Sequence, residues 1–509
     1  MFLRFVLLAA AILAAGGLSQ GASPAPAAVE SSGDVLLIEG VVTEEGVPAR
    51  FTKVVDLRTG YSRTTRQTGG ATEMSGYDGM PWDFSNGSFE VSDLPSRVAD
   101  ERARAFVDRA GWREAGAVTG ASVAERSAGA DAAVLYRPPD GSDVRIAYDA
   151  STRLPTQVTI DADYGPTVTS FADWRPVGPF HYPFRRTETR GTGAAVTYQA
   201  ERVRLLPYRP ALFARPASRQ QARLVGGRPA AIAVELVGAR RAQIVVPARV
   251  SGHDASFVFD TGASDNYLVN TFVASLHLPV SGGLSITGVG SSSSAGGYAM
   301  IDRLSLGSAE LRNQNVVTGP SFFPSASTVS GLLGYPFLAA FRTTIDYRAG
   351  TLTFRSFDEP SDSRGSRLPI FADERIIYVS ARIGGVEGLF RVDSGDGGTL
   401  TIFPAFAQRH GLDPGGEAVL AGNGAGGGFT ARPGRLASFS IGGLTFHDLP
   451  VRFSQNRAGA FASRSLAGNM GGGILQCFRV TFDYRAHVLA LEPQPDTPNC
   501  AQGAAITRD

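Results

Sequence analysis

The 509-residue sequence has few of the residues that mark metal sites or nucleic-acid partners. Its six histidines are scattered, without metal-ligand spacing such as His-Glu-x-x-His. The formal net charge of +1 gives no reason to expect nucleic acid or an acidic membrane surface as a partner. Beyond the N-terminus no run reaches about eighteen uninterrupted apolar residues, so no integral membrane segment is predicted. We expect no metal and no cofactor.

Cysteine is also scarce, with only Cys477 and Cys500 in the chain. In an oxidising compartment the two could pair and attach the C-terminal tail to the last helix. The alternative is two unpaired thiols, one of them buried; the disulfide is slightly favoured. Cysteine catalysis is not favoured, because neither residue has a plausible histidine partner nearby in the sequence.

The first 28 residues have the pattern of a secretory signal peptide. Arg4 precedes an apolar run over residues 5–15, and small residues follow. No cysteine lies near the expected cleavage point, so a lipid-anchored form is not predicted. An uncleaved N-terminal anchor is the alternative. We expect a periplasmic or secreted protein without an integral membrane segment after signal removal.

Residues 33–208 alternate in the manner of β-strands and predict a β-rich N-terminal domain. One amphipathic helix is expected over residues 97–113, where apolar side chains recur every three or four positions. Residues 209–229 are rich in proline, arginine and alanine and are predicted to be a linker.

The most informative feature is a segment that occurs twice. Phe-Val-Phe-Asp-Thr-Gly-Ala at 257–263 is matched by Leu-Phe-Arg-Val-Asp-Ser-Gly at 389–395, and each is preceded by a strand and a glycine turn. Further on, Phe-Arg and Asp-Tyr-Arg-Ala recur in the same order and spacing. Two ordered matches favour an internal duplication. They predict one lobe over residues 230–355, a second over 367–493, and a C-terminal tail at 494–509.

Each lobe is expected to end in the same sequence of elements. Short helices are predicted at 337–341 and 474–478, each followed by a strand, a turn and a last strand. Gly350 suits the turn of the first closing hairpin.

These paired motifs resemble those of the aspartic peptidases, in a single-chain, two-lobed form like pepsin but with compact lobes closer to a retropepsin subunit. The resemblance covers both lobes and implies two tandem β-barrels facing each other. It implies that two aspartates share one proton and activate water, as is established for aspartic-protease dyads. It also implies a set of loop residues that support the dyad. The catalytic pair is Asp260 and Asp393, and the supporting residues are Thr261, Gly262, Gly334, Ser394, Gly395 and Gly471.

The same resemblance predicts glycine-rich flaps over the cleft at 287–297 and 422–428; surface loops are the alternative for each. Two residues of the second lobe depart from the family pattern. Asp396 stands where the family usually has serine, threonine or alanine, and Asn469 replaces an apolar residue. A third carboxylate beside the dyad would raise its proton affinity or spoil the site, unless Asp396 points outward.

The N-terminal domain resembles the half-barrel of periplasmic lipoprotein-carrier proteins, through its strand order and segments such as 148–155 and 180–183. This resemblance implies a curved sheet that binds a lipid or a peptide. The favoured interpretation is a positioning domain without a ligand of its own.

The sequence therefore predicts a mainly β protein: two tandem pepsin/retropepsin-like β-barrel lobes preceded by a β-rich half-barrel-like domain with a helix. The predicted function is an aspartic endopeptidase that acts as a monomer on a peptide or protein substrate. The alternative is a catalytically weak or inactive peptidase-like module that binds peptide or lipid in the cell envelope.

Overall fold

The structure is a computed structural model. It is mainly β, which confirms the predicted fold class. The segment expected to be a signal peptide lies outside the described residues. Among the residues that are described, no helix is long and apolar enough to cross a membrane. The structure describes residues 34–68, 71–114, 121–126, 133–191, 193–218, 221–323, 328–361, 363–412 and 414–508.

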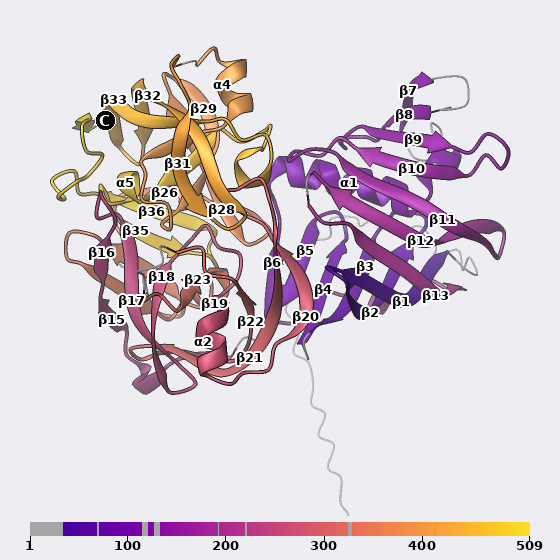
Figure 1. Cartoon of the computed structure of the whole chain (residues 1–509), viewed down its shortest axis with the longest axis horizontal. Helices are drawn as coiled ribbons and strands as arrows, with labels where there is room; N and C mark the ends of the chain where they lie inside the picture. Colours follow the sequence, from indigo (N-terminus) through magenta and orange to yellow (C-terminus); the bar gives the residue numbers. More distant parts are fainter. Residues whose placement is uncertain are drawn as a thin grey trace, which may run out of the picture.

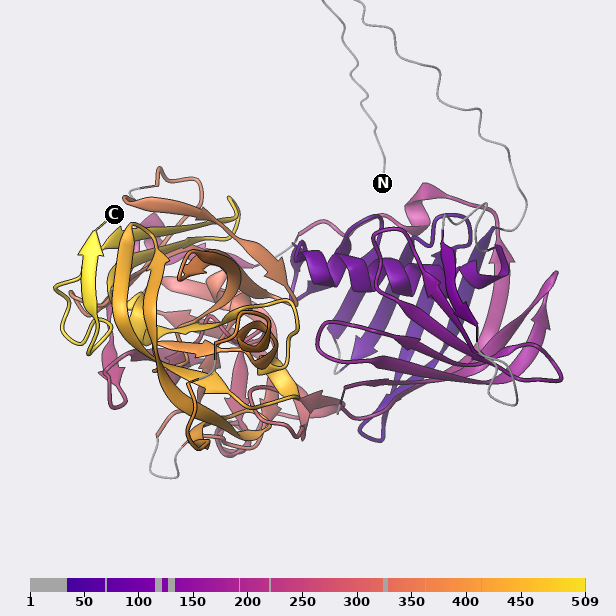
Figure 2. The same ribbon diagram turned by 90° about the horizontal axis from the view of Figure 1, so that it is seen from above.

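The N-terminal domain is one large antiparallel sheet with a helix lying across it (Figures 1 and 2). In the described part of the domain, the strand order is β6-β5-β4-β3-β2-β1-β13-β12-β11-β10-β9-β8-β7, so only the β1–β13 pair joins strands distant in sequence. The strands are β1 (Val35–Glu44), β2 (Val47–Asp56), β3 (Ser62–Thr68), β4 (Ala71–Tyr77), β5 (Pro81–Ser85), β6 (Ser88–Val91), β7 (Ser122–Arg126), β8 (Ala133–Arg137), β9 (Val144–Tyr148), β10 (Pro155–Ile160), β11 (Thr167–Val177), β12 (Phe180–Arg190) and β13 (Val196–Leu206).

Helix α1 (Pro95–Asp108) is shorter than the predicted helix. Proline in the first turn is tolerated because the first backbone N–H groups of a helix have no acceptor within the helix. The predicted end at residue 113 is wrong because Ala110 adopts φ 55°, which ends the helical path before the 3-10 turn η1 (Gly111–Glu114). Phe106 and its neighbours pack against the apolar face of the sheet.

The first lobe contains strands that follow one another around a common apolar core. Its described strands pair in the order β14-β22-β19-β23-β18-β17-β21-β20, with β16 on β17. The elements are η2 (Pro210–Leu212), β14 (Ala222–Leu224), η3 (Val225–Gly227), β15 (Ala230–Ala233), β16 (Glu235–Val237), β17 (Gln243–Val250), β18 (His253–Phe259), β19 (Tyr267–Val269), α2 (Asn270–Ser275), β20 (Ser281–Ile286), β21 (Ser294–Leu306), β22 (Ala309–Gly319), β23 (Gly331–Leu333), α3 (Tyr335–Leu338), β24 (Arg342–Asp346) and β25 (Thr351–Arg355).

The second lobe repeats this order of elements. Its described strands pair in the order β27-β28-β29-β34-β30-β33-β32-β31, and β37 pairs with β33. The elements are β26 (Ser366–Pro369), β27 (Phe371–Asp373), β28 (Ile376–Ile383), β29 (Val386–Asp393), β30 (Leu400–Ile402), α4 (Pro404–Arg409), β31 (Val419–Gly424), β32 (Gly427–Ile441), β33 (Leu444–Ser454), η4 (Gly459–Phe461), β34 (Gly468–Gly471), α5 (Gly472–Leu475), β35 (Phe478–Asp483), β36 (Val488–Pro493) and β37 (Ala505–Arg508).

A six-stranded sheet, β15-β25-β24-β35-β36-β26, joins the two lobes in the described chain. At its centre β24 of one lobe pairs antiparallel with β35 of the other. The hydroxyl oxygens of Thr344 and Thr481, which face each other in this pairing, are 2.9 Å apart and buried. The sheet therefore fixes the orientation of the lobes relative to each other.

Four segments differ from their expected structure. The short helices α3 and α5 each begin two residues before the predicted start and do not reach the predicted end. The segment expected to be a linker includes β14, which pairs with β22 of the first lobe. The tail likewise includes β37, which adds a strand beside β33.

The N-terminal domain docks on the second lobe through polar and apolar contacts. The carboxylate of Asp163 accepts hydrogen bonds from the Ser463 hydroxyl (2.6 Å) and from the backbone N–H groups of Arg464 (3.0 Å) and Ser465 (2.7 Å). Leu94 packs in one apolar cluster with side chains of the second lobe. Figure 1 shows the two parts side by side, with the start of α1 near the lobes.

Cys477 and Cys500 form a disulfide, 23 residues apart. It attaches the tail to the end of α5, where the backbone N–H of Ala501 also donates to the carbonyl oxygen of Gly473 (3.0 Å).

We expect Cys500→Ser to lower the free energy of unfolding by about 3 kcal/mol, since closure of a loop of this length restricts the unfolded chain. Urea unfolding with and without reductant measures it; a wild-type midpoint unchanged by reductant would contradict the estimate.

Candidate active site

Two buried strands deliver the paired aspartates to the same place. Phe259, at the end of β18, is fully buried, and Asp260 follows it and donates its backbone N–H to the carbonyl oxygen of Leu333 (3.0 Å). Asp393 ends β29 and lies opposite Gly471 in the parallel pairing with β34. In each lobe a parallel neighbour strand therefore fixes the carboxylate at a strand end.

The two carboxylates lie against each other across the lobe boundary. A Cβ atom at Gly262 would be 2.7 Å from Cγ of Asp393, and one at Gly395 would overlap the carboxyl group of Asp260. The Asp260 and Asp393 side chains are close enough for each other's presence to raise the pKa of Asp260. The glycine of each loop thus leaves the space that the aspartate of the other lobe occupies.

Thr261 and Ser394 tie the two loops together reciprocally. The backbone N–H of Thr261 donates to Oγ of Ser394 (3.1 Å), and the backbone N–H of Ser394 donates to Oγ1 of Thr261 (3.0 Å). Each hydroxyl then donates across the boundary, Thr261 to the carbonyl oxygen of Val392 (2.8 Å) and Ser394 to that of Phe259 (2.8 Å). Both side chains are buried, so these four bonds are shielded from water.

Gly334 and Gly471 lie directly behind the aspartate loops. A Cβ at Gly334 would overlap the carbonyl oxygens of Ala263 and Asp265, and one at Gly471 would overlap those of Gly398 and Asp396. Backbone contact at this distance excludes any side chain at the two positions.

Burial raises the pKa of both aspartates. For Asp260 the desolvation of the carboxylate is the largest cause, and the charge of Asp393 adds to it, so its pKa lies well above its usual range. For Asp393 desolvation again comes first, followed by the nearby charge of Asp396, while Arg391 opposes both. Two carboxylates this close share one proton at a pH between the two ionisations of the pair.

Asp396 lines the cleft and is held in a polar network of its own lobe. Its carboxylate accepts two hydrogen bonds from one guanidinium nitrogen of Arg452 (2.8 and 2.6 Å), and the side-chain amide of Asn469 donates to it at 3.0 Å. Desolvation would raise the pKa of Asp396, but Arg452 outweighs it and lowers that pKa. The two departures from the family pattern therefore contact each other, and Arg452 offsets the charge of Asp396.

Sequence reasoning missed three arginines at this site. Arg391, two residues before Asp393, is buried and lines the cleft, and its charge lowers the pKa of both aspartates. Arg452 holds Asp396, and Arg375 forms an ion pair with Asp265 of the other lobe (2.9 Å). Arg391 could have been noticed in the sequence, because the matching position of the first lobe holds Val258. Arg452 and Arg375 could not, because they lie on segments distant from the aspartate motifs.

The dyad lies at the floor of a cleft of about 1710 Å³ lined by both lobes. Two hairpin turns close over it, at the segments predicted to be flaps. The backbone N–H of Gly290 donates to the carbonyl oxygen of Ala425 (3.1 Å), and that of Ala460 donates to Gly288 (2.8 Å). These bonds join the two lobes across the cleft and would have to break for the segments to separate.

The N-terminal domain stays outside the cleft. Among the described residues, the first that lines it is Glu235, in the first lobe. The described part of the chain also has no group of three or more histidine, cysteine, aspartate or glutamate side chains placed to hold a metal ion. The arrangement offers a paired carboxyl system, in which one group can accept a proton while the other donates one.

Comparison with protein families gives one match. The model of the family described as "Aspartyl protease" matches residues 246–337 and 379–475. The first match contains Asp260 and Gly334, and the second contains Asp393 and Gly471. No curated protein matches the chain. The two lobes thus match the aspartyl protease family in tandem.

Proposed function

We propose that the protein is an aspartic endopeptidase in which Asp260 and Asp393 hydrolyse peptide bonds with an activated water. The observation that carries the proposal is the contact between the two carboxylates across the lobe boundary, at the floor of the cleft. The two lobes that form this cleft both match the aspartyl protease family. The two similar lobes also favour a duplication of one ancestral unit.

The chemistry follows from the shared proton. The ionised aspartate removes a proton from water as it attacks the peptide carbonyl carbon, while the protonated partner donates its proton to the carbonyl oxygen. Collapse of the tetrahedral intermediate then requires a proton on the leaving nitrogen, which the carboxyl that received the water proton supplies. Thr261 and Ser394 act as positioning residues, because they hold the two loops at a fixed separation.

The proposed location is the periplasm or the exterior of the cell. The apolar N-terminal run of the sequence supports export, and the disulfide between Cys477 and Cys500 is consistent with an oxidising compartment.

The test compares the full chain with the double variant Asp260→Asn/Asp393→Asn on unfolded casein, from pH 3 to pH 8. Mass spectrometry of the products should show new peptides with the wild type and none with the double variant. If the wild type produces no peptides at any pH but still binds casein, the protein is a peptide-binding module and the proposal fails.

The network around Asp396 gives a prediction about pH. Arg452→Gln removes the cation that offsets the Asp396 charge, so the pKa of the neighbouring Asp393 should rise and the pH profile of kcat/KM should move upward by roughly one unit. Asp396→Asn removes the negative charge, so the profile should move downward. Shifts in the same direction for both variants would contradict this electrostatic account.

A further inference from the structure

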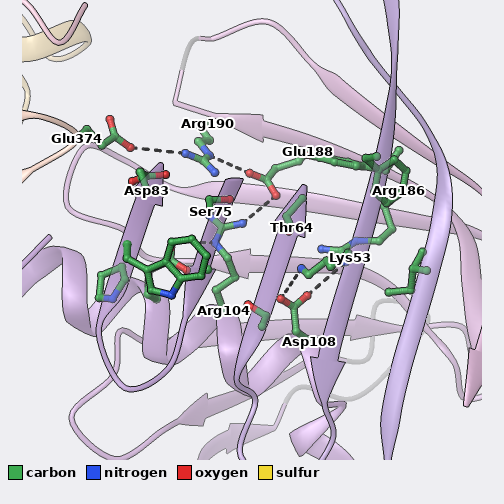
Figure 3. A pocket seen from close by; sticks show the side chains of 18 of the residues that line it. Lys53, Thr64, Ser75, Asp83, Arg104, Asp108, Arg186, Glu188, Arg190 and Glu374 are labelled. Carbon is green, nitrogen blue, oxygen red and sulfur yellow. Dashed lines mark hydrogen bonds and ion pairs between the residues drawn. The ribbon is translucent and has the colours of Figure 1, made fainter. Parts of the chain in front are cut away.

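A second cavity, of about 370 Å³, lies between the N-terminal sheet, helix α1 and the nearby edge of the lobes (Figure 3). Its volume is within the range of small-ligand sites. Ser264 and Asp265, which follow the catalytic loop of the first lobe, line both this cavity and the cleft. The two spaces therefore adjoin at these residues.

Cations outnumber carboxylates at the inner end of the cavity. Asp108 lies between Lys53 (2.6 Å) and Arg186 (3.2 Å), and the three side chains meet in Figure 3. The Nε–H group of Arg186 has no hydrogen-bond acceptor in the described structure. Burial lowers the pKa of Lys53, and Asp108 opposes this, while the charge of Arg186 lowers the pKa further.

The next carboxylate along the cavity is shared in the same way. Glu188 lies between Arg104 (2.9 Å) and Arg190 (2.8 Å). Arg104 also pairs with Glu101 (3.3 Å), so the charges of this second group balance, and the excess of positive charge lies with Lys53 and Arg186 around Asp108. A ligand carboxylate would complete these hydrogen bonds.

The end of the cavity near the lobes has the opposite charge. Asp83 faces it without a hydrogen bond or ion pair to any described residue, and Glu374 and Asp265 lie at the same end (Figure 3 labels the first two). Arg375 forms an ion pair with Asp265 (2.9 Å) and Arg97 forms one with Glu374 (3.4 Å), so the unpaired negative charge at this end is that of Asp83. The charges are therefore sorted along the cavity, with the cationic end farther from the cleft.

We propose that this cavity binds the C-terminal carboxylate of a peptide that reaches it from the cleft past Ser264 and Asp265. The inner cations receive the carboxylate, and the same cations repel the N-terminal ammonium group of a peptide in the reverse orientation. This inference rests on the proposed function, since the peptide is the one held over the dyad. It makes the N-terminal domain part of the substrate site and gives the peptidase a preference for bonds near a free C-terminus.

A fatty acid carries the same carboxylate and is the competing source. Aromatic side chains that could contact an acyl chain also line the cavity: Phe51, Trp82, Tyr182, Phe184 and Tyr198. The shared lining with the cleft favours the peptide, because an acyl chain has no need of that connection.

The experiment measures binding in the full chain carrying Asp260→Asn/Asp393→Asn, so that no cleavage occurs. Dye-labelled hexapeptides with a free C-terminal carboxylate or with a C-terminal amide are compared by fluorescence anisotropy. The carboxylate form should bind at least about tenfold more tightly. Arg186→Met should remove this preference, and Asp108 then keeps Lys53 as its partner. Ser75→Phe, which fills the cavity without a change of charge, should also remove the preference for the carboxylate form.

Arg185→Met is the matched control, because Arg185 is the adjacent residue on β12 and is exposed on the other face. It should retain the preference. Equal affinities for acid and amide, a preference that survives in Arg186→Met and Ser75→Phe, or displacement of the peptide by oleate at lower concentration than by unlabelled peptide would each overturn the inference. These outcomes are independent of catalysis, so a failure to cleave casein would overturn only the proposed function.

Discussion

Asp260→Asn and Asp393→Asn should each reduce kcat on unfolded casein or a model peptide by about 10³-fold or more, with a smaller change in KM. Each substitution leaves an amide that can neither take a proton from water nor give one to the substrate, and general acid–base catalysis typically contributes 10²–10⁴-fold. The two single variants and the double variant should be almost equally inactive, because the carboxylates act as one unit.

The same variants should be more stable than the wild type at neutral pH. Folding raises the pKa of both carboxyls, and an acid with a raised pKa destabilises the folded state increasingly as the pH rises from its unfolded-state pKa to its folded-state pKa. Tm at pH 7 should therefore rise, and the gain should disappear at pH 3, where the carboxyls are protonated in both states. This separates a loss of chemistry from a loss of folding.

Asp254→Asn is a suitable control, since Asp254 is 86% exposed and lies on β18 of the same lobe, in an ion pair with Arg249. It should leave both activity and Tm unchanged, because exposed ion pairs contribute little. Substantial cleavage by either dyad variant would contradict a mechanism in which the two carboxylates share the proton.

The site could be located from the sequence because its chemistry lies in two short segments with a recognisable order. A buried apolar strand followed by Asp-Thr-Gly or Asp-Ser-Gly places the carboxylate at a strand end, and the presence of two copies predicts that the loops meet. The structure brings them together, with Thr261 and Ser394 bonded across the boundary.

The surroundings of the dyad could not be predicted in the same way. Arg452 reaches Asp396 from a strand 56 positions later, and Arg375 reaches Asp265 from the other lobe, 110 positions away. Such pairs depend on strand order, which a single sequence does not specify. Asp396 therefore looked like an unpaired third carboxylate, although the protein supplies it with a cation.

Local propensity also misplaced the short helices. The glycines that begin α5 are poor helix formers, and the prediction moved its start to the apolar residues that follow. Tertiary contacts outweigh that propensity, because the backbone N–H of Gly472 donates to the carbonyl oxygen of Asp396 (2.7 Å) and that of Gly473 donates to Gly398 (2.8 Å). The aspartate loop thus fixes where the helix begins.

The bonds between the two loops give the second large prediction. Thr261→Val should lower the free energy of unfolding by about 2 kcal/mol, and Thr261→Val/Ser394→Ala by about 4 kcal/mol, since each lost hydroxyl leaves a buried backbone N–H and a buried carbonyl unpaired. Because the same bonds set the separation of the carboxylates, kcat should fall at least about tenfold while KM changes little.

Thr401→Val provides the matched control for the lost hydroxyl. Thr401 is fully buried, and its hydroxyl has no hydrogen-bond partner in the described structure, so its removal should be neutral or slightly stabilising. Urea unfolding and steady-state kinetics of the three variants measure both effects. If Thr261→Val proves no more destabilising than Thr401→Val, the cross-lobe bonds do not hold the loops. The carboxylate separation must then be set by the central pairing of β24 with β35 instead.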